Sequence, residues 1–191
     1  MADRWTRRTL LAGAAAALWM GRAGAVQEPN ERPATGAVRN NLSSFRAIRW
    51  QDHFDTLENG VILADTRSKA VHFWSEDEST YRLYPSSVPA SEDLTRLGYT
   101  RIVRTRVGPT WTPTPSMRER DPSLPVTVAA GPENPLGTHA LYLSWQYYLI
   151  HGTHDTRKIG RASSDGCIGL YNEHIEELFS LARVGTQVRL I

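Results

Sequence analysis

The sequence predicts a mostly β domain with little helix and long loops, and three observations support this prediction. Many apolar runs of about five residues are separated by turn residues, a pattern typical of strands. Two long segments rich in glycine and proline interrupt these runs, and proline disfavours central strands and helix interiors. A helical period of apolar residues is clear only near the C-terminus. The chain has 191 residues, 40% of them apolar, which suits one globular domain with its own core.

The first 25 residues predict a cleaved export signal. The pair Arg7-Arg8 precedes an apolar run from Leu10 to Met20, which is too short to span a bilayer. Small residues at 23–25 offer a cleavage site, and the arginine pair favours the twin-arginine route. The alternative, a buried N-terminal helix, explains neither feature. Since no later apolar run is long enough to span a membrane, we expect an exported protein of the periplasm or cell wall, without an integral membrane span after signal removal.

The net charge of the remaining chain gives no reason to expect a nucleic-acid partner. Removing the signal lowers Lys+Arg from 22 to 18 and Asp+Glu from 20 to 19, so the formal net charge changes from +2 to −1. The five charged residues of the signal are Asp3, Arg4, Arg7, Arg8 and Arg22.

Residues 26–57 predict a flexible tether followed by a lead-in segment. Residues 26–41 are polar, with two prolines and no periodicity. Residues 43–57 carry spaced aromatic and aliphatic side chains, and we expect them to pack on the domain. The folded domain is then predicted to span 58–191.

Strands are predicted wherever short apolar runs recur. A polar connection at 65–69 predicts a hairpin between the first two strands. The fourth strand carries several arginines, which indicates a partly solvated strand at a sheet edge or in a groove. The predicted strands cover residues 61–64, 70–74, 81–84, 99–107, 139–143, 147–150 and 187–191.

Loops and one helix complete the pattern. The segments 108–125 and 131–137 are predicted to be loops that wall a substrate cleft, because such long loops in compact domains usually serve function. A helix is predicted to begin with Asn172 as its N-cap and to be stopped by Gly185. Its apolar face contains Ile175, Leu178, Phe179 and Ala182.

The stretch from residue 148 to 170 contains the candidate catalytic residues. Cys167 is the single cysteine, so the chain forms no internal disulfide. A thiol becomes a good nucleophile when a base removes its proton, and His151, sixteen positions before Cys167, is the candidate base. Apolar runs at 148–150 and 168–170 predict two adjacent strands that would bring both side chains to one end of a sheet. The alternative is a buried, inert cysteine.

These residues resemble the L,D-transpeptidase (YkuD-type) catalytic domain, over about Val61 to Ile191. The family signature, a histidine followed downstream by Ser/Thr-His-Gly-Cys, corresponds to His151-Gly152-Thr153 and to Ser164-Asp165-Gly166-Cys167. Further matching segments are Ile62-Leu63-Ala64-Asp65, Gly131 to Gly137, and Val184 to Val188.

The resemblance implies a β-sandwich-like fold of mixed sheets with one or two short helices. It also implies an exported cysteine acyltransferase acting on peptidoglycan. Its nucleophile falls on Cys167 and its base on His151, and the backbone carbonyl of Gly152 would orient the imidazole. Backbone N–H groups of Gly166 and Cys167 would form the oxyanion hole.

The implied donor is a stem tetrapeptide that loses D-alanine and leaves a thioester. An amine then resolves the thioester, forming a 3-3 cross-link or attaching a protein, and the sequence does not choose between acceptors. The alternatives are an L,D-carboxypeptidase or hydrolase of the same fold, a non-catalytic wall-binding domain, and a purely structural protein. No cofactor or metal is expected, since the spacing His151-x-x-His154-Asp155 lacks a third well-placed ligand.

Two positions depart from the family motif. Asp165 replaces its histidine, and a carboxylate beside a thiol should raise the thiol pKa. Asp165 therefore either points away from the sulfur or binds a substrate amine. Gly169 stands where many members carry arginine, so another cation would have to act, with Arg157, Lys158 and Arg161 in the same loop. The candidate substrate-binding residues are Ser164, Asp165, Arg161, His154, Asn134 and Trp111.

Overall fold

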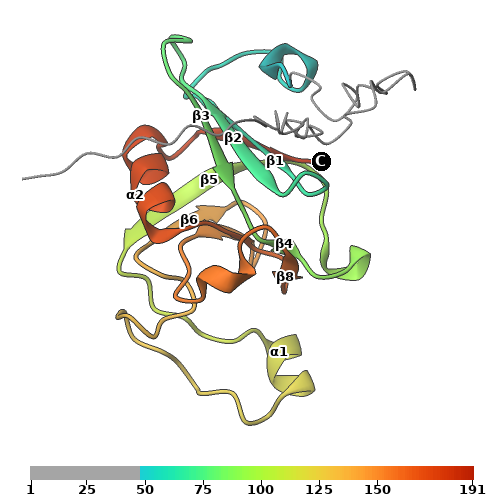
Figure 1. Cartoon of the computed structure of the whole chain (residues 1–191), viewed down its shortest axis with the longest axis vertical. Helices are drawn as coiled ribbons and strands as arrows, with labels where there is room; N and C mark the ends of the chain where they lie inside the picture. Colours follow the sequence, from blue (N-terminus) through green and yellow to red (C-terminus); the bar gives the residue numbers. More distant parts are fainter. Residues whose placement is uncertain (1–47) are drawn as a thin grey trace, which may run out of the picture. The chain divides into compact units, whose positions relative to one another are not determined.

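The computed structural model describes residues 48–191, so the predicted signal and most of the predicted tether and lead-in segment lie outside the described residues. Eight strands form one mixed sheet in the order β3-β2-β1-β10-β5-β6-β7-β9, and β4 and β8 pair separately (Figure 1). The strands are β1 (Val61–Asp65), β2 (Ala70–Trp74), β3 (Tyr81–Pro85), β4 (Val88–Pro89), β5 (Gly98–Val107), β6 (His139–Leu143), β7 (Leu149–His151), β8 (Ala162–Ser164), β9 (Ile168–Gly169) and β10 (Gln187–Leu190). The helices are α1 (Pro115–Arg120) and α2 (Asn172–Leu181), with 3₁₀ turns at Trp50–Asp52, Glu92–Leu94 and Thr156–Lys158. The predicted mostly β fold is confirmed.

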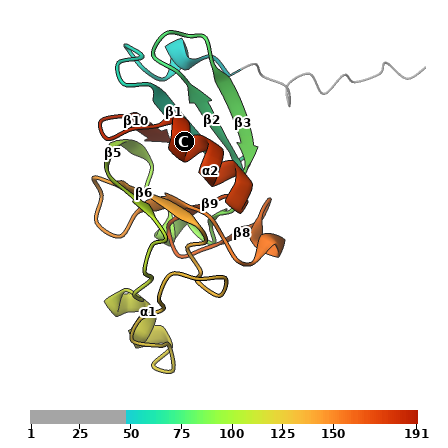
Figure 2. The same ribbon diagram turned by 90° about the vertical axis from the view of Figure 1, so that its left-hand side faces the viewer.

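The sheet curls so that its two halves face one core, which α2 helps to fill (Figure 2). Side chains of β1 and β2 meet those of β5, β6, β7 and β9 there, together with Ile175 and Leu178 of α2, both fully buried. This single curled sheet gives the sandwich-like arrangement, because its two halves bury their apolar faces against each other and the helix. Within residues 48–191, no helix is long and apolar enough to cross a membrane.

The first four residues of strand β1 are apolar because both faces of the strand are covered there. Ile62 and Ala64 point into the main core. Val61 and Leu63 point to the other side, where Phe54 and Leu57 pack against them. A strand that is buried on both faces is expected to be a continuous apolar run rather than an alternating one.

Helix α1 lies inside the segment that the sequence predicted to be loop, so that prediction is wrong for residues 115–120. Pro115 occupies the first helical position, where its missing N–H costs nothing. The Thr114 hydroxyl caps the helix by accepting a hydrogen bond from Met117 N at 3.3 Å. Proline therefore begins this helix instead of preventing it.

The predicted N-cap of α2 is also wrong by one residue. Tyr171 is the N-cap, and Asn172 is the first helical residue. The Asn172 side-chain oxygen instead accepts a hydrogen bond from the backbone N–H of Thr138 at 3.1 Å. Asn172 thus ties the start of β6 to the helix, and the helix ends at Leu181, before Gly185.

Strand β5 is partly solvated as predicted, but it is not an edge strand. It lies between β10 and β6 in the sheet. Of its ten residues only Ile102 is buried, and the pairing register with β6 shifts between Ile102 and Arg104. Its exposure arises because one face of the sheet remains open at this strand, and that face forms part of a cleft.

Candidate active site

Strands β7 and β9 place His151 and Cys167 on the same face of the sheet. The two strands are parallel neighbours, with Ile150 opposite Ile168 and His151 opposite Gly169. Continuing this register by one residue puts Cys167 opposite Leu149. Because side chains alternate along a strand, His151 and Cys167 project from the same face, one diagonal step apart. The predicted pair of adjacent strands is confirmed.

The His151 ring is held by a backbone carbonyl. Its Nδ1 lies 2.5 Å from the oxygen of Gly152. A carbonyl only accepts hydrogen bonds, so Nδ1 carries the proton and Nε2 is free to accept one in the neutral ring. Burial lowers the pKa of His151 to about 4, with the Gly152 hydrogen bond opposing this shift and Lys158 adding to it. The imidazole is therefore neutral at pH 7 and able to take a proton.

Glycine at position 152 is required by close packing against α2. A Cβ atom there would lie 2.3 Å from Asn172 Oδ1 and 3.1 Å from Ile175 Cγ2. A Cβ atom at Gly137 would also meet the Asn172 oxygen, at 2.2 Å, and Gly137 adopts a left-handed φ of +63°. These contacts fix the backbone that carries the Gly152 carbonyl, and thereby the orientation of the imidazole.

The Cys167 thiol is protonated in this state. Burial, and to a smaller extent the Asp165 carboxylate, raise its pKa to about 11, against the backbone N–H of Leu149, which favours the thiolate. The thiol lies 3.3 Å from the carbonyl oxygen of Tyr147, to which it donates. Among the hydrogen bonds recorded for residues 48–191, none joins Cys167 Sγ to His151. The two groups share a face without a recorded hydrogen bond between them.

The turn before Cys167 is shaped by Ser164 and Gly166. The Ser164 hydroxyl donates to the carbonyl of Cys167 at 2.5 Å and accepts from Gly166 N at 3.4 Å. Gly166 has a φ of +124°, a region that favours glycine. Ser164 therefore supports the turn that presents the thiol.

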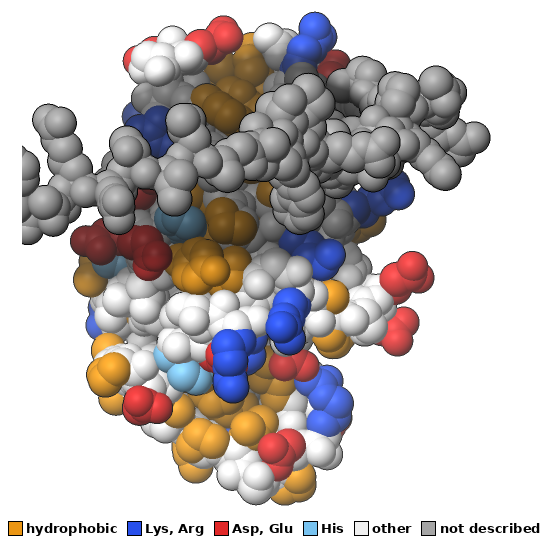
Figure 3. Space-filling model, in the orientation of Figure 1, with side chains coloured by type: hydrophobic (Ala, Val, Ile, Leu, Met, Phe, Trp, Pro, Cys, Tyr) orange, Lys and Arg blue, Asp and Glu red, His pale blue; other side chains and the backbone are white. Residues whose placement is uncertain are grey.

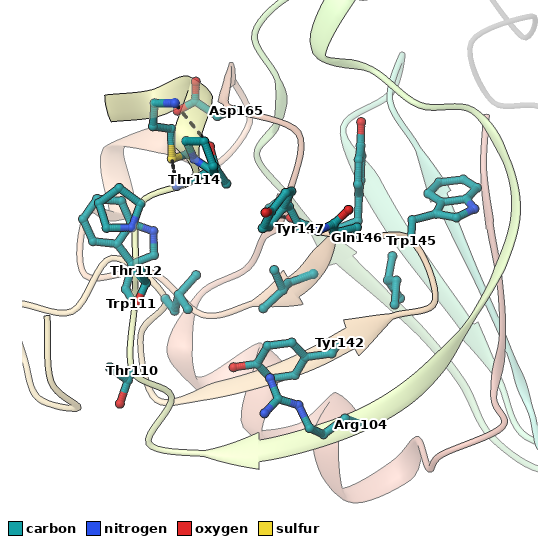
Figure 4. Close-up of a pocket in the computed structure, with 18 of the residues that line it drawn as sticks. Arg104, Thr110, Trp111, Thr112, Thr114, Tyr142, Trp145, Gln146, Tyr147 and Asp165 are labelled. Carbon is teal, nitrogen blue, oxygen red and sulfur yellow. Dashed lines mark hydrogen bonds between the residues drawn. The ribbon is translucent and has the colours of Figure 1, made fainter. Parts of the chain in front are cut away.

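A cleft of about 950 Å³ opens at Cys167. Figure 4 shows Trp111, Thr112 and Thr114 on one side, Tyr142 and Arg104 along the floor, and Trp145 to Tyr147 on the other side. The Arg104 guanidinium lies 3.6 Å from the centre of the Tyr142 ring, a cation–π contact. The prediction that the proline-rich segment walls a cleft agrees with this arrangement, and Trp111 lines it. The second predicted wall, residues 131–137, contributes Leu136.

Asp165 also lines the cleft, and its partner was not predicted. Its carboxylate pairs with the guanidinium of Arg120, which comes from α1. Of the cations expected to act here, Arg157 instead pairs with Asp155 at 2.7 Å. Arg120 is far away in the sequence, and no local pattern connects it to the motif around Cys167.

Asn134, a predicted substrate-binding candidate, is fully buried, and its amide is used internally. Its side-chain nitrogen donates to the carbonyls of Pro109, Val128 and Ala129, and its oxygen accepts from Leu136 N at 2.8 Å. Two further candidates, Arg161 and His154, are exposed and are not among the residues that line the cleft.

The spacing His151-x-x-His154-Asp155 does not produce a metal centre in the described part of the chain. No group of three His, Cys, Asp or Glu side chains converges within residues 48–191. The residues that line the cleft include the Cys167 thiol and Asp165, which is paired with Arg120, whereas His151 is not among them.

A neutral imidazole and a thiol on one sheet face, beside an open cleft, define a candidate cysteine acyl-transfer site. The family model of the L,D-transpeptidase catalytic domain matches residues 59–190, and the chain belongs to this family. A putative L,D-transpeptidase from the ATP synthase subunits region of Fuscovulum blasticum is 54% identical over the full length of both chains. The probable L,D-transpeptidase ErfK/SrfK of Escherichia coli is 37% identical over 72% of this chain and 45% of its own length.

Solved structures agree on the fold. L,D-transpeptidase 3 from Mycobacterium tuberculosis aligns with a TM-score of 0.54 at 14% identity, covering 70% of this chain and 61% of that one. The L,D-transpeptidase from Mycobacterium smegmatis aligns with a TM-score of 0.52 at 18% identity, covering 70% and 58%. At this identity the likeness shows the fold alone. The chain spans less than half of the Escherichia coli relative, which is therefore a larger protein.

Proposed function

We propose that the protein is a peptidoglycan L,D-transpeptidase with Cys167 as nucleophile and His151 as general base. The observation that carries this proposal is their shared face beside the cleft, with the imidazole neutral and its Nδ1 fixed on Gly152. This is the arrangement of nucleophile, base and orienting group that covalent acyl transfer requires.

Acylation begins when His151 Nε2 takes the proton of Cys167 as the sulfur attacks a carbonyl. The attacked bond joins the third residue of a stem tetrapeptide, a diamino acid, to its terminal D-alanine. The backbone N–H of Cys167 stabilises the oxyanion together with that of Gly166, which leaves the Ser164 hydroxyl to do so. His151 then returns the proton to the departing amine, D-alanine leaves, and a thioester to Cys167 remains.

Deacylation uses the same groups in reverse. His151 removes a proton from an acceptor amine, which attacks the thioester carbonyl and releases the thiol. A diamino acid side chain as acceptor gives a 3-3 cross-link, and a protein amine gives an attached protein. Water gives carboxypeptidase action, so the acceptor decides the product.

The thiol must first leave its hydrogen bond to Tyr147. Rotation about the Cα–Cβ bond of Cys167 moves the sulfur across the face that it shares with His151. Catalytic hydrogen bonds are often long or absent without substrate and form in the Michaelis complex. The resting thiol is protonated at neutral pH because its pKa is about 11, so His151 has to remove this proton for the sulfur to attack.

The sequence supports an exported protein that acts in the periplasm or cell wall. Its support is the arginine pair Arg7-Arg8, the apolar run that follows it and the small residues at 23–25. The proposed arrangement is a signal at 1–25, a tether and lead-in at 26–57, and the catalytic domain at 58–191.

The test is intact-mass spectrometry of the purified protein with a stem tetrapeptide, beside Cys167→Ala and His151→Ala. A thioester adduct that forms with loss of D-alanine, is absent from Cys167→Ala and slowed in His151→Ala supports the proposal. An added diamino acid should then become the acceptor. Hydrolysis alone, unchanged by added amine, would favour the carboxypeptidase. A folded protein with a free thiol and no adduct would favour the wall-binding domain.

A further inference from the structure

Residues 109–134, here called the wall segment, form a loop whose two ends lie close together. The backbones of Trp111 and Val128 pair across their base, and the buried Asn134 amide binds three carbonyls there. Helix α1 lies at the far end of the segment, away from the sheet (Figure 1). Apolar side chains gather over this end of the molecule (Figure 3), and Val126 is 75% exposed.

One recorded side-chain bond connects residues 110–133 of this segment to the rest of the described chain. It is the ion pair between Arg120 and Asp165. The other hydrogen bonds recorded for these residues stay within the wall segment, for example Arg118 to the carbonyl of Val126 at 2.6 Å. The ion pair therefore connects α1 to the loop that carries Cys167.

The pair places a cation on a carboxylate that stands beside the candidate nucleophile. Asp165 precedes Cys167 by two residues, and both line the cleft. The negative charge of Asp165 opposes formation of the thiolate. The two side chains are 51% and 43% exposed, so solvent screens the interaction without removing it.

We propose that Arg120 is a positioning residue for this reaction: it compensates the charge of Asp165 and so allows a carboxylate to stand beside the Cys167 nucleophile. The proposal rests on the proposed function, because it takes Cys167 as the attacking group. It also accounts for the departure from the family motif, since the carboxylate at position 165 is paired with the Arg120 guanidinium of α1.

The other titratable and charged groups around Cys167 do not supply this compensation. His151 on β7 is neutral at pH 7, because its pKa lies near 4. Tyr148, which immediately precedes β7, is neutral as well, since burial and the nearby Cys167 raise its pKa. Two other cations line the cleft. The Arg118 guanidinium of α1 donates to the carbonyl of Val126, and the Arg104 guanidinium of β5 lies over the Tyr142 ring. Arg120 is the group with a direct bond to Asp165.

Alkylation of the single cysteine by iodoacetamide measures this effect without requiring transpeptidase activity. The rate as a function of pH gives the titration midpoint of the Cys167 thiol. Arg120→Ala should raise the midpoint by about half a pKa unit, which is roughly a threefold loss of thiolate below the midpoint. Asp165→Asn should lower the midpoint, and Arg120→Ala should have no further effect in the Asp165→Asn background.

Arg157→Ala serves as the control, because it breaks another arginine–aspartate ion pair, one that does not line the cleft, and it should leave the midpoint unchanged. Acylation by the stem tetrapeptide should slow in Arg120→Ala and recover in the double variant with Asp165→Asn. An unchanged midpoint in Arg120→Ala, or an equal shift with and without Asp165, would overturn the inference. Midpoints that shift as expected while no variant is acylated would instead refute the proposed function.

Discussion

His151 stands opposite Gly169 across the parallel strands β7 and β9, and this pairing sets the spacing of the site. Cys167 lies two residues before Gly169 and so reaches the same face. A Cβ atom at Gly169 would lie 3.8 Å from His151 Cε1 and only 2.4 Å from Ser87 Oγ. The backbones of Ser87 and Gly169 also pair with each other. The glycine that departs from the family motif thus leaves room for a buried serine.

Gly169→Ala is expected to destabilise the protein by about 1–3 kcal/mol, because the added methyl group meets the Ser87 hydroxyl in a packed region. Ser87→Ala removes that oxygen, so the double variant should recover most of the loss. Urea unfolding of the wild type, both single variants and the double variant measures this coupling. If the loss persists unchanged in the double variant, the contact with Ser87 is not its cause.

Asn134→Asp is expected to lower the free energy of unfolding by about 2–4 kcal/mol. The substitution keeps the oxygen that accepts from Leu136 N, but it removes the amide donor from three carbonyls and buries a carboxylate. Urea unfolding reports the loss. Thr110→Ala, at an exposed position in the same segment, is the control and should change stability little. Unchanged stability with a raised KM for the tetrapeptide would return Asn134 to the role of a substrate-binding residue.

Local sequence patterns predicted the strands well, because a strand requires only a short run of suitable side chains. The hairpin of β1 and β2 is an example, since Ala70 to Trp74 was located without error. The sequence also predicted that Cys167 and His151 lie at adjacent strands, because each residue stands next to a short apolar run. The strands β4 and β8 were not predicted, since two or three residues give no period to detect.

Tertiary relationships could not be predicted in the same way. The pairing of Arg120 with Asp165 joins residues 45 positions apart and leaves no local signal. Asn134 illustrates the reverse case. A polar residue among turn residues suggests an exposed loop, whereas this one is buried and binds the carbonyls of Val128 and Ala129 and, 25 positions away, that of Pro109. Helix α1 could have been found from Thr114-Pro115, a cap followed by proline at the first helical position.

Acidification should destabilise the protein partly through His151. The folded-state pKa is about 4, below the ordinary value of 6.5. Between these pH values the unfolded state binds the proton and the folded state does not, so stability falls as pH falls from 6.5 to 4. The shift corresponds to about 3 kcal/mol at pH 4.

Urea unfolding of the wild type and His151→Gln at several pH values isolates this contribution. Burial also lowers the pKa values of His53 and His72, so part of the pH dependence should remain in the variant. The exposed His154 provides the control, since His154→Gln should leave the wild-type pH dependence intact. Identical profiles for the wild type and His151→Gln would contradict the assignment of a neutral, buried imidazole.

Gly152→Ala should slow acylation of Cys167 by more than the loss of folded protein alone would cause. The new methyl group would lie 2.3 Å from Asn172 Oδ1, so the backbone at Gly152 must move, and with it the carbonyl that holds His151 Nδ1. A displacement of about 1 Å at such a site can cost roughly a hundredfold in rate. Single-turnover acylation by the stem tetrapeptide measures the rate, and urea unfolding measures the stability of the same samples.

Asn172→Ala separates the steric cause from a general loss of structure. This variant removes the oxygen that the new methyl group meets, although it also removes the hydrogen bond to Thr138 N. The double variant should therefore acylate faster than Gly152→Ala alone, while remaining below the wild type because Ile175 Cγ2 still lies 3.1 Å from the added carbon. Acylation of Gly152→Ala at the wild-type rate would mean that the Gly152 carbonyl does not orient the base. The imidazole would then have to be held by its burial alone, and the Nδ1 hydrogen bond would have no part in the reaction.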